Sequence, residues 1–178
     1  MRLMVKKSYC RLRKVIYLAG GDVLKGRVEP ILWMKTCHHL AQAGFDVELI
    51  STYQHRPENI KRKDVFRHFG VTPCFRISIL PTLMTSSNSY KNWFRLQYFV
   101  LLTVYLITKL LFNIDTIIYS KSQLSMQIVL LIEKILRRKF FKIFEIHCVH
   151  ESKSLINMLK QMNLVVSNSK IVEEKLAN

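Results

Sequence analysis

The chain has 178 residues, of which 49% are hydrophobic, and its 28 Lys and Arg against 12 Asp and Glu give a net charge of +16. This length fits one domain with a sizeable core, and the hydrophobic content excludes a disordered chain. The positive charge predicts attraction to anions, such as phosphate groups or an anionic membrane surface. Nucleic acid is not expected as a partner, because the sequence has neither a recognised binding module nor basic residues interleaved with exposed aromatic ones.

The first half of the chain predicts a βαβ unit behind a basic tail of residues 1–13. A buried strand over 14–19 runs into Gly20 and Gly21, and a helix follows with Pro30 in its first turn. Gly44 is expected to end that helix in the left-handed conformation, before a second strand over 47–50.

Strands and helices continue to alternate in the second half. After a short helix within 59–68, strands are predicted over 74–80, 116–119, 141–146 and 164–166, and helices over 93–112, 123–138, 152–162 and from a cap at Ser169. The strands are continuous apolar runs, as expected where both faces of a sheet are covered. The sequence therefore predicts an α/β fold, a Rossmann-like doubly wound parallel sheet, in one domain over 14–178.

The helix over 93–112 raises the question of a membrane. Residues 96–108 carry no charge, but Arg95 and Lys109 bound them. A spanning helix needs about 20 apolar residues, so a buried helix, or one that lies on a membrane surface with basic flanks, is favoured.

The cysteines predict the compartment. Cys10, Cys37, Cys74 and Cys148 are scattered without paired spacing, and the first residues lack an apolar run of signal-peptide length. Free thiols in a reducing cytosol are expected, which predicts a cytoplasmic protein, peripheral at the inner face of the membrane where the apolar helix docks.

Polar residues at the carboxyl ends of the predicted strands are the candidate site. Gly20 and Gly21 would let backbone N–H groups approach a diphosphate or an acceptor sugar, or they form an ordinary turn. Ser120 and Lys121 end the fourth strand, where Lys121 would contact phosphate or an acceptor hydroxyl, or both residues form a solvated strand end.

The fifth strand ends with an acid and an imidazole. Glu145 and His147 share a strand face, so Glu145 either orients the His147 ring or is a structural hydrogen-bonding acid. His147 itself either lines the crevice or is a histidine satisfied by backbone. No metal is expected, because His147, Cys148 and His150 match no zinc spacing and no fourth ligand is evident.

Five segments in order resemble the N-terminal domain of the GT-B glycosyltransferases, and within them the retaining family 4. Besides the strand that runs into Gly20-Gly21, they are the helix end over 40–47, DTIIYSKS at 115–122, FEIH at 144–147 and LVVSNS at 164–169. The third is similar to the family's Asp-x-x-Tyr-x-Arg-Ser and the fourth to its Tyr-Glu-x-His. Lys121 stands where Arg is common and Phe45 where His is common.

The resemblance implies the acceptor-side half of a GT-B enzyme, with the C-terminal donor-binding domain absent from this chain. The complete enzyme would be a hexosyltransferase that moves a sugar from a nucleotide-sugar to a polysaccharide or glycolipid acceptor, with retention and without metal or cofactor. Gly20, Gly21, Ser120, Lys121, Glu145 and His147 would bind donor or acceptor, and the chain alone is not expected to turn over.

Two alternatives remain open. The first is a non-catalytic, membrane-associated subunit of a split glycosyltransferase that works with a separate donor-domain chain. The second is an unrelated nucleotide-binding α/β protein, since a fold by itself does not fix a function.

Overall fold

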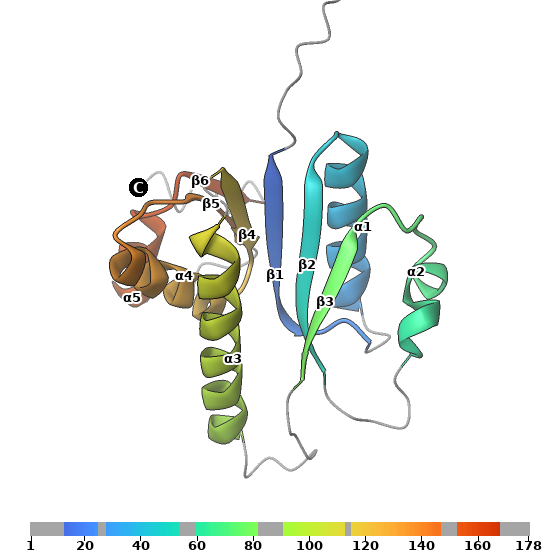
Figure 1. The fold of residues 1–178 in the computed structure, drawn as a ribbon, viewed down its shortest axis with the longest axis horizontal. Coiled ribbons are helices and arrows are strands. Elements are labelled where there is room, and N and C mark those ends of the chain that lie inside the picture. The colour runs from blue at the N-terminus through green and yellow to red at the C-terminus, as the bar shows by residue number, and fades with distance from the viewer. Residues whose placement is uncertain are drawn as a thin grey trace, which may run out of the picture.

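The computed structural model describes residues 13–24, 28–53, 60–81, 91–112, 115–146 and 153–167. In these residues six strands form one parallel sheet in the order β3-β2-β1-β4-β5-β6 (Figure 1). The strands are β1 (Lys14–Asp22), β2 (Asp46–Tyr53), β3 (Arg76–Pro81), β4 (Thr116–Ser120), β5 (Phe141–Ile146) and β6 (Leu164–Ser167). The predicted α/β, doubly wound parallel sheet is confirmed.

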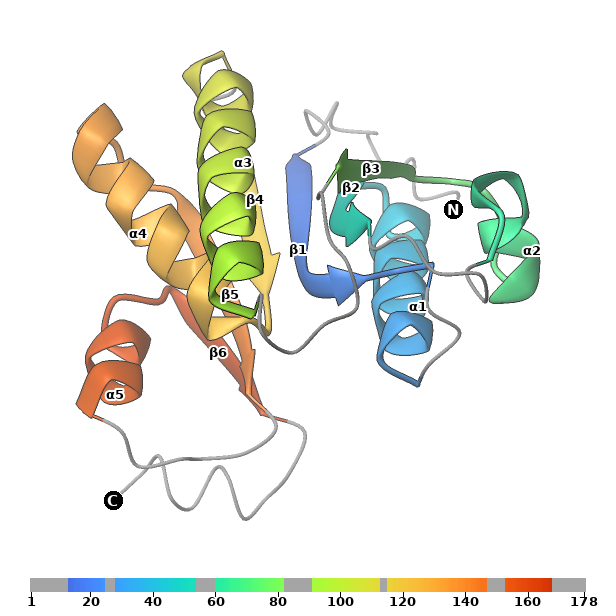
Figure 2. The same cartoon turned by 90° about the horizontal axis from the view of Figure 1, so that it is seen from below.

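Helices cover the sheet from both sides (Figures 1 and 2). One side carries α1 (Val28–Gln42), the 3-10 turn η1 (Arg62–Asp64) and α2 (Val65–His68), and the other carries α3 (Lys91–Leu111), α4 (Gln123–Leu136) and α5 (Lys153–Leu159). The change of side follows from the topology. The chain builds β1, β2 and β3 outward and then returns to place β4 on the other flank of β1, so right-handed crossovers put the later helices on the opposite face.

Alternate residues of β1 supply the two cores. Ile16 and Leu18 pack with α3, α4 and α5, whereas Val15 and Tyr17 pack with α1 and α2. This division follows from the two-residue period of a strand, and both sets are buried because β1 lies at the centre of the sheet.

The predicted boundaries hold with local differences. Gly44 follows the end of α1 with a φ of 91°, as predicted for a left-handed cap residue. The first strand runs beyond the predicted 14–19 through both glycines to Asp22, with a register shift after Leu18. The apolar residues of this strand predicted its first part. The end that contains the two glycines was not predicted, because its pairing depends on β2. The tail over 1–12, His147 and the helix predicted from Ser169 lie outside the described residues.

The long helix α3 is anchored on the sheet by its inner face. Tyr98, Leu102, Leu106 and Leu110 are four residues apart and all buried, as expected for one face of an α-helix. In the described part of the chain, no helix combines the length and the apolarity needed to cross a membrane.

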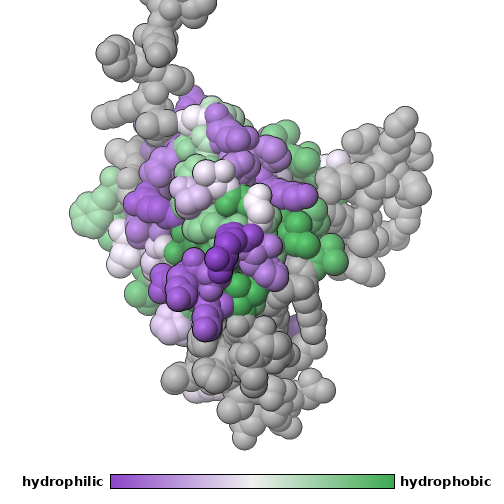
Figure 3. Space-filling view, turned by 90° about the vertical axis from the view of Figure 1, so that its right-hand side faces the viewer, coloured by the Kyte–Doolittle hydropathy of each residue, from purple (hydrophilic) through white to green (hydrophobic). Residues whose placement is uncertain are grey.

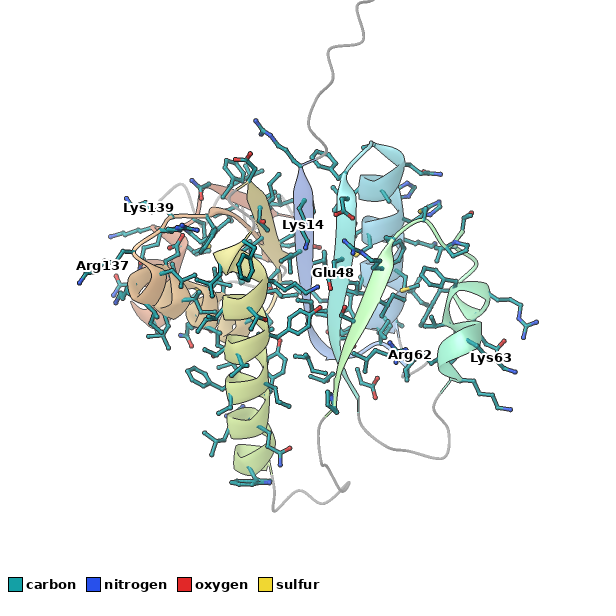
Figure 4. All side chains as sticks on the ribbon, in the orientation of Figure 1. Lys14, Glu48, Arg62, Lys63, Arg137 and Lys139 are labelled. Atoms are coloured by element: carbon teal, nitrogen blue, oxygen red, sulfur yellow. The ribbon has the colours of Figure 1, made fainter. Side chains whose placement is uncertain are left out.

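A buried polar cluster joins α3 to the amino-terminal half of the sheet. The Glu48 carboxylate accepts hydrogen bonds from Ser78 Oγ at 2.6 Å and from the Tyr105 hydroxyl. Its oxygens also lie 3.6 Å from Lys14 Nζ and 3.5 Å from Lys109 Nζ. Figure 4 shows Lys14 and Glu48 extending from neighbouring strands into the same space. Because the Glu48 side chain is only 2% exposed, these partners have to replace its hydration.

Basic runs lie on the outside of the molecule. Arg62 and Lys63 project from η1, and Arg137 and Lys139 project beyond the end of α4 (Figure 4). Figure 3 shows the molecule from the right-hand side of Figure 1, where α2 lies. The surface there is hydrophilic at its centre, with hydrophobic patches around it. The run over 61–63 is therefore a solvated face in this structure.

Candidate functional site at the carboxyl ends of β1 and β4

The sheet order reverses between β1 and β4, so their carboxyl ends and the following loops diverge there. Leu18 of β1 is in register with Ser120 of β4, and the chain leaves β1 toward α1 but leaves β4 toward α4, on the other face. In open α/β sheets this switch point is where ligands bind. The sequence predicted the glycines and the Ser120-Lys121 pair separately, and the structure brings them together here.

Gly20 is required by a close approach to the start of α4. A Cβ added at Gly20 would lie 2.8 Å from Ser122 Cβ, closer than real Cβ contacts come. Ser122 is the N-cap of α4, and its hydroxyl accepts a hydrogen bond from Ser125 N. The glycine thus lets the end of β1 pass directly against the amino terminus of α4, where N–H groups and the helix dipole favour anions.

The Ser120 side chain forms hydrogen bonds within the protein. It is fully buried, and its Oγ donates to Leu18 O at 2.9 Å and accepts from Ser122 N at 3.0 Å. These contacts tie β4 to β1 and shape the turn into α4. The expected alternative, a solvated strand end, is therefore wrong for Ser120, and its contact with donor or acceptor stays a prediction.

Ser51 of β2 holds the loop after β1, and the sequence did not single it out. Its Oγ donates to Gly21 O at 2.8 Å and accepts from Val23 N at 2.8 Å. Asp22 Oδ1 accepts from Leu24 N at 2.9 Å and tightens the same turn. The signal was present, because Ser51 is the first polar residue after the apolar run of the second strand, as Ser120 is after the fourth.

Lys121 lies beside an aromatic ring from α1. Its Nζ is 5.2 Å from the centroid of Trp33 and 3.7 Å from Glu29 Oε1. A Cβ at Gly21 would lie 3.2 Å from the same ring, so Trp33 fills the space between the glycine loop and Lys121. Glu29 is 71% exposed, so its ion pair with Lys121 is screened by water and leaves a cation at the site.

Trp33 was also missed by the sequence reasoning. It is 2% exposed and its indole Nε1 has no hydrogen-bond partner in the described structure. Its position in α1 reads as ordinary core, and only the packing of α1 across the end of β1 brings it to the site.

Glu145 accepts a hydrogen bond from a tyrosine of the neighbouring strand. Tyr119 Oη donates to Glu145 Oε2 at 2.9 Å, and the Tyr17 ring stacks on the Tyr119 ring at 4.9 Å. Burial, reinforced by the negative charge of Glu145, raises the pKa of both tyrosines far above the ordinary value, so both stay protonated at neutral pH. The contact supports the structural alternative for Glu145, while its relation to His147 stays a prediction because His147 lies outside the described residues.

Across the described ranges, no group of three His, Cys, Asp or Glu side chains is arranged to hold a metal ion. Cys148 and His150 lie outside those ranges.

The sheet order and the site define a Rossmann-like α/β domain with a glycine loop at its switch point. No protein-family model matches the chain, and no curated protein matches it. Among solved structures it is similar to HepE from Anabaena, crystallised with UDP and glucose, with a TM-score of 0.53 and 12% sequence identity. The match covers 93% of this chain but only 40% of HepE. At this identity the likeness shows a shared fold.

Proposed function

We propose that residues 14–178 form the acceptor-side, N-terminal domain of a GT-B glycosyltransferase of the retaining family 4 type. The observation that carries the proposal is the switch point, where Gly20 meets the amino terminus of α4 with Lys121 beside it. The likeness to HepE supports it, because UDP and glucose are the two parts of a nucleotide-sugar. The donor-binding domain would come from polypeptide outside these 178 residues.

The proposed reaction assigns a role to the charge at the site. A hexose passes from a nucleotide-sugar to a hydroxyl of a polysaccharide or glycolipid acceptor. The bond between the sugar carbon and the diphosphate oxygen breaks, a bond from that carbon to the acceptor oxygen forms, and the hydroxyl proton passes to the leaving diphosphate. Negative charge then develops on the leaving diphosphate. The Lys121 ammonium and the N–H groups at the start of α4 are the groups here that would stabilise this charge, without metal or cofactor.

The remaining residues have positioning roles in this proposal. Gly20 and Gly21 would offer backbone N–H groups to the ligand, Ser120 fixes the turn into α4, and Glu145 holds the hydroxyl of Tyr119. His147 would contact the donor sugar. Because the other half of the nucleotide-sugar site would lie in the donor domain, this chain is expected not to transfer sugar by itself.

The test uses the purified chain and its backbone NMR spectrum. UDP-glucose at millimolar concentration should shift the amide signals of Gly20, Gly21 and residues 121–125, and Lys121→Met should weaken binding by about tenfold. Lys63→Met, at an exposed lysine away from the site, is the matched control. Shifts that avoid the switch point would contradict the proposed site, and sugar transfer by the chain alone would contradict the proposed dependence on a donor domain.

A second candidate is a non-catalytic subunit of a split glycosyltransferase, at the inner face of a membrane in the cytoplasm and paired with a separate donor-domain chain. The exposed apolar side of α3 and the net charge of +16 favour it. The mass of the native product in its source cells separates the two. A band near twice 21.0 kDa supports the two-domain enzyme, and a band at 21.0 kDa supports the subunit.

A further inference from the structure

The helix α3 has a second apolar face, opposite the one that packs on the sheet. At 3.6 residues per turn the side chains of this face fall within an arc of about 80°. Their exposed fractions are 55% for Trp93, 52% for Leu96, 50% for Val100, 58% for Val104 and 46% for Leu111. We call these five residues the outer stripe.

The outer stripe is continuous along the helix. Single exposed apolar residues are ordinary on protein surfaces, but a contiguous set marks an interaction surface. The stripe continues to Phe112, which is 86% exposed, and Leu131 and Ile135 are exposed on α4, which packs beside α3. No described element covers these side chains.

A basic corner borders the carboxyl-terminal end of the outer stripe. Arg138 Nη1 donates to Leu111 O at 3.3 Å, so the end of α4 abuts the end of α3. The exposed cations of this corner are Lys134, Arg137, Arg138 and Lys139. The nearest acid along the chain, Glu133, is bound to Lys142 and does not offset them. From Val65 to Ile114 the chain has no acidic residue at all.

We propose that the outer stripe and the basic corner dock this domain on an anionic lipid surface. A neutral apolar face lying along a helix, with cations at its border, inserts shallowly among lipid headgroups while the cations meet anionic lipids. In this proposal α3 lies in the plane of the membrane, with the outer stripe toward the lipid. An acidic protein partner would need carboxylates placed at the basic corner. An anionic bilayer offers apolar chains to the outer stripe and anionic headgroups to the basic corner.

The docking face also orients the candidate site. Near the start of α3, Tyr98 Oη lies 2.7 Å from Ser125 Oγ of α4 and donates to Ala19 O of β1 at 3.4 Å. The Trp93 and Leu96 end of the outer stripe is therefore the end beside the carboxyl edge of the sheet. Docking would bring the switch point close to the lipid surface, where a lipid-linked acceptor presents its sugar. The delivery of a lipid-linked acceptor to the switch point rests on the proposed function, but the docking itself does not require sugar transfer.

The experiment is flotation of the purified chain with vesicles of phosphatidylcholine, with and without about 30% phosphatidylglycerol. The expected result is binding to the anionic vesicles only. Val104→Asp should weaken it by about tenfold or more, because it removes an apolar side chain that would insert among the lipids and adds a charge that anionic lipids repel. Arg137→Gln with Arg138→Gln should weaken it by about fivefold for each charge removed. Ile156→Asp, on α5 and 44% exposed, is the matched control and should bind as wild type.

A second readout guards against a variant that fails to fold. Trp33 is 2% exposed and Trp93 is 55% exposed, so in a Trp33→Phe chain the fluorescence reports Trp93 alone. Its emission should shift to the blue with anionic vesicles and stay unchanged with neutral ones. Equal binding by wild type and Val104→Asp would overturn the proposal, as would no binding to anionic vesicles. Sedimentation that shows a wild-type dimer and a Val104→Asp monomer would instead assign the stripe to a second copy of the chain.

Discussion

Replacing Glu48 by Gln should destabilise the domain by an amount that depends on pH. Burial raises the pKa of this carboxyl, but the hydrogen bonds from Ser78 and Tyr105 and the charges of Lys109 and Lys14 outweigh burial and lower the pKa to about 2. Glutamine keeps the size of the side chain and removes its charge. It also leaves Lys14 of β1 and Lys109 of α3 without this counter-charge.

The size and sign of the effect follow from linkage. A carboxyl with a pKa of 4.5 when unfolded and about 2 when folded contributes about 3 kcal/mol at neutral pH. Because the folded pKa is the lower one, this contribution is complete above about pH 5 and is lost as the pH falls through about 2. At pH 3 about 1 kcal/mol should remain.

The assay is urea unfolding of wild type and Glu48→Gln at pH 7 and pH 3. The difference in free energy of unfolding should be about 3 kcal/mol at pH 7 and clearly smaller at pH 3. Asp46→Asn is the matched control, since Asp46 also pairs with a cation, Arg76, but is 44% exposed, and it should cost less than about 1 kcal/mol. A Glu48→Gln effect of the same size at both pH values would refute the reasoning, because the carboxylate charge would then contribute nothing.

Three further predictions concern the switch point and a helix end, and the first two are measured by urea unfolding at pH 7. Gly20→Ala should cost about 2 to 3 kcal/mol, because its Cβ would press on Ser122. Gly44→Ala, at a φ of 91° with open space around it, should cost only about 1 kcal/mol, and equal costs would contradict the close approach at Gly20. Ser120→Ala should cost about 1 to 3 kcal/mol, since it leaves Leu18 O and Ser122 N without their buried partner, and a neutral result would contradict the bonding assigned to Ser120. Lys121→Met should leave the melting temperature nearly unchanged while it weakens UDP-glucose binding, because its ion pair with Glu29 is exposed; a large loss of stability would assign Lys121 to the fold.

Sequence patterns predicted most of the secondary structure correctly, for identifiable reasons. The apolar runs of the strands and of the helix over 93–112 are local, and the alternation of side chains along a strand places such runs on both buried faces of the sheet. Gly44 is likewise a local signal, because a helix end needs a particular residue at a particular place. The fold class followed from the alternation of these elements.

The sequence could not show which residues meet at the site, because the site is formed by contacts between residues that are far apart in the chain. The partner of the Ser120 hydroxyl could not be read from the sequence, because the register of β4 with β1 directs that hydroxyl to Leu18 O. Ser51 and Trp33 were missed because their neighbours, Gly21 and Lys121, come from other strands and loops. In each case the residue was visible in the sequence, and its partner was not.

By itself the sequence determined the fold class, the order of the elements and the chemical character of the strand ends, because these depend on local periodicity and residue type. Only the tertiary structure decided which hydroxyl holds the loop after β1, which aromatic ring lies beside Lys121 and which side of α3 stays uncovered. These contacts depend on the order and register of the strands. They join segments that are far apart in the chain, so no pattern within one segment predicts them.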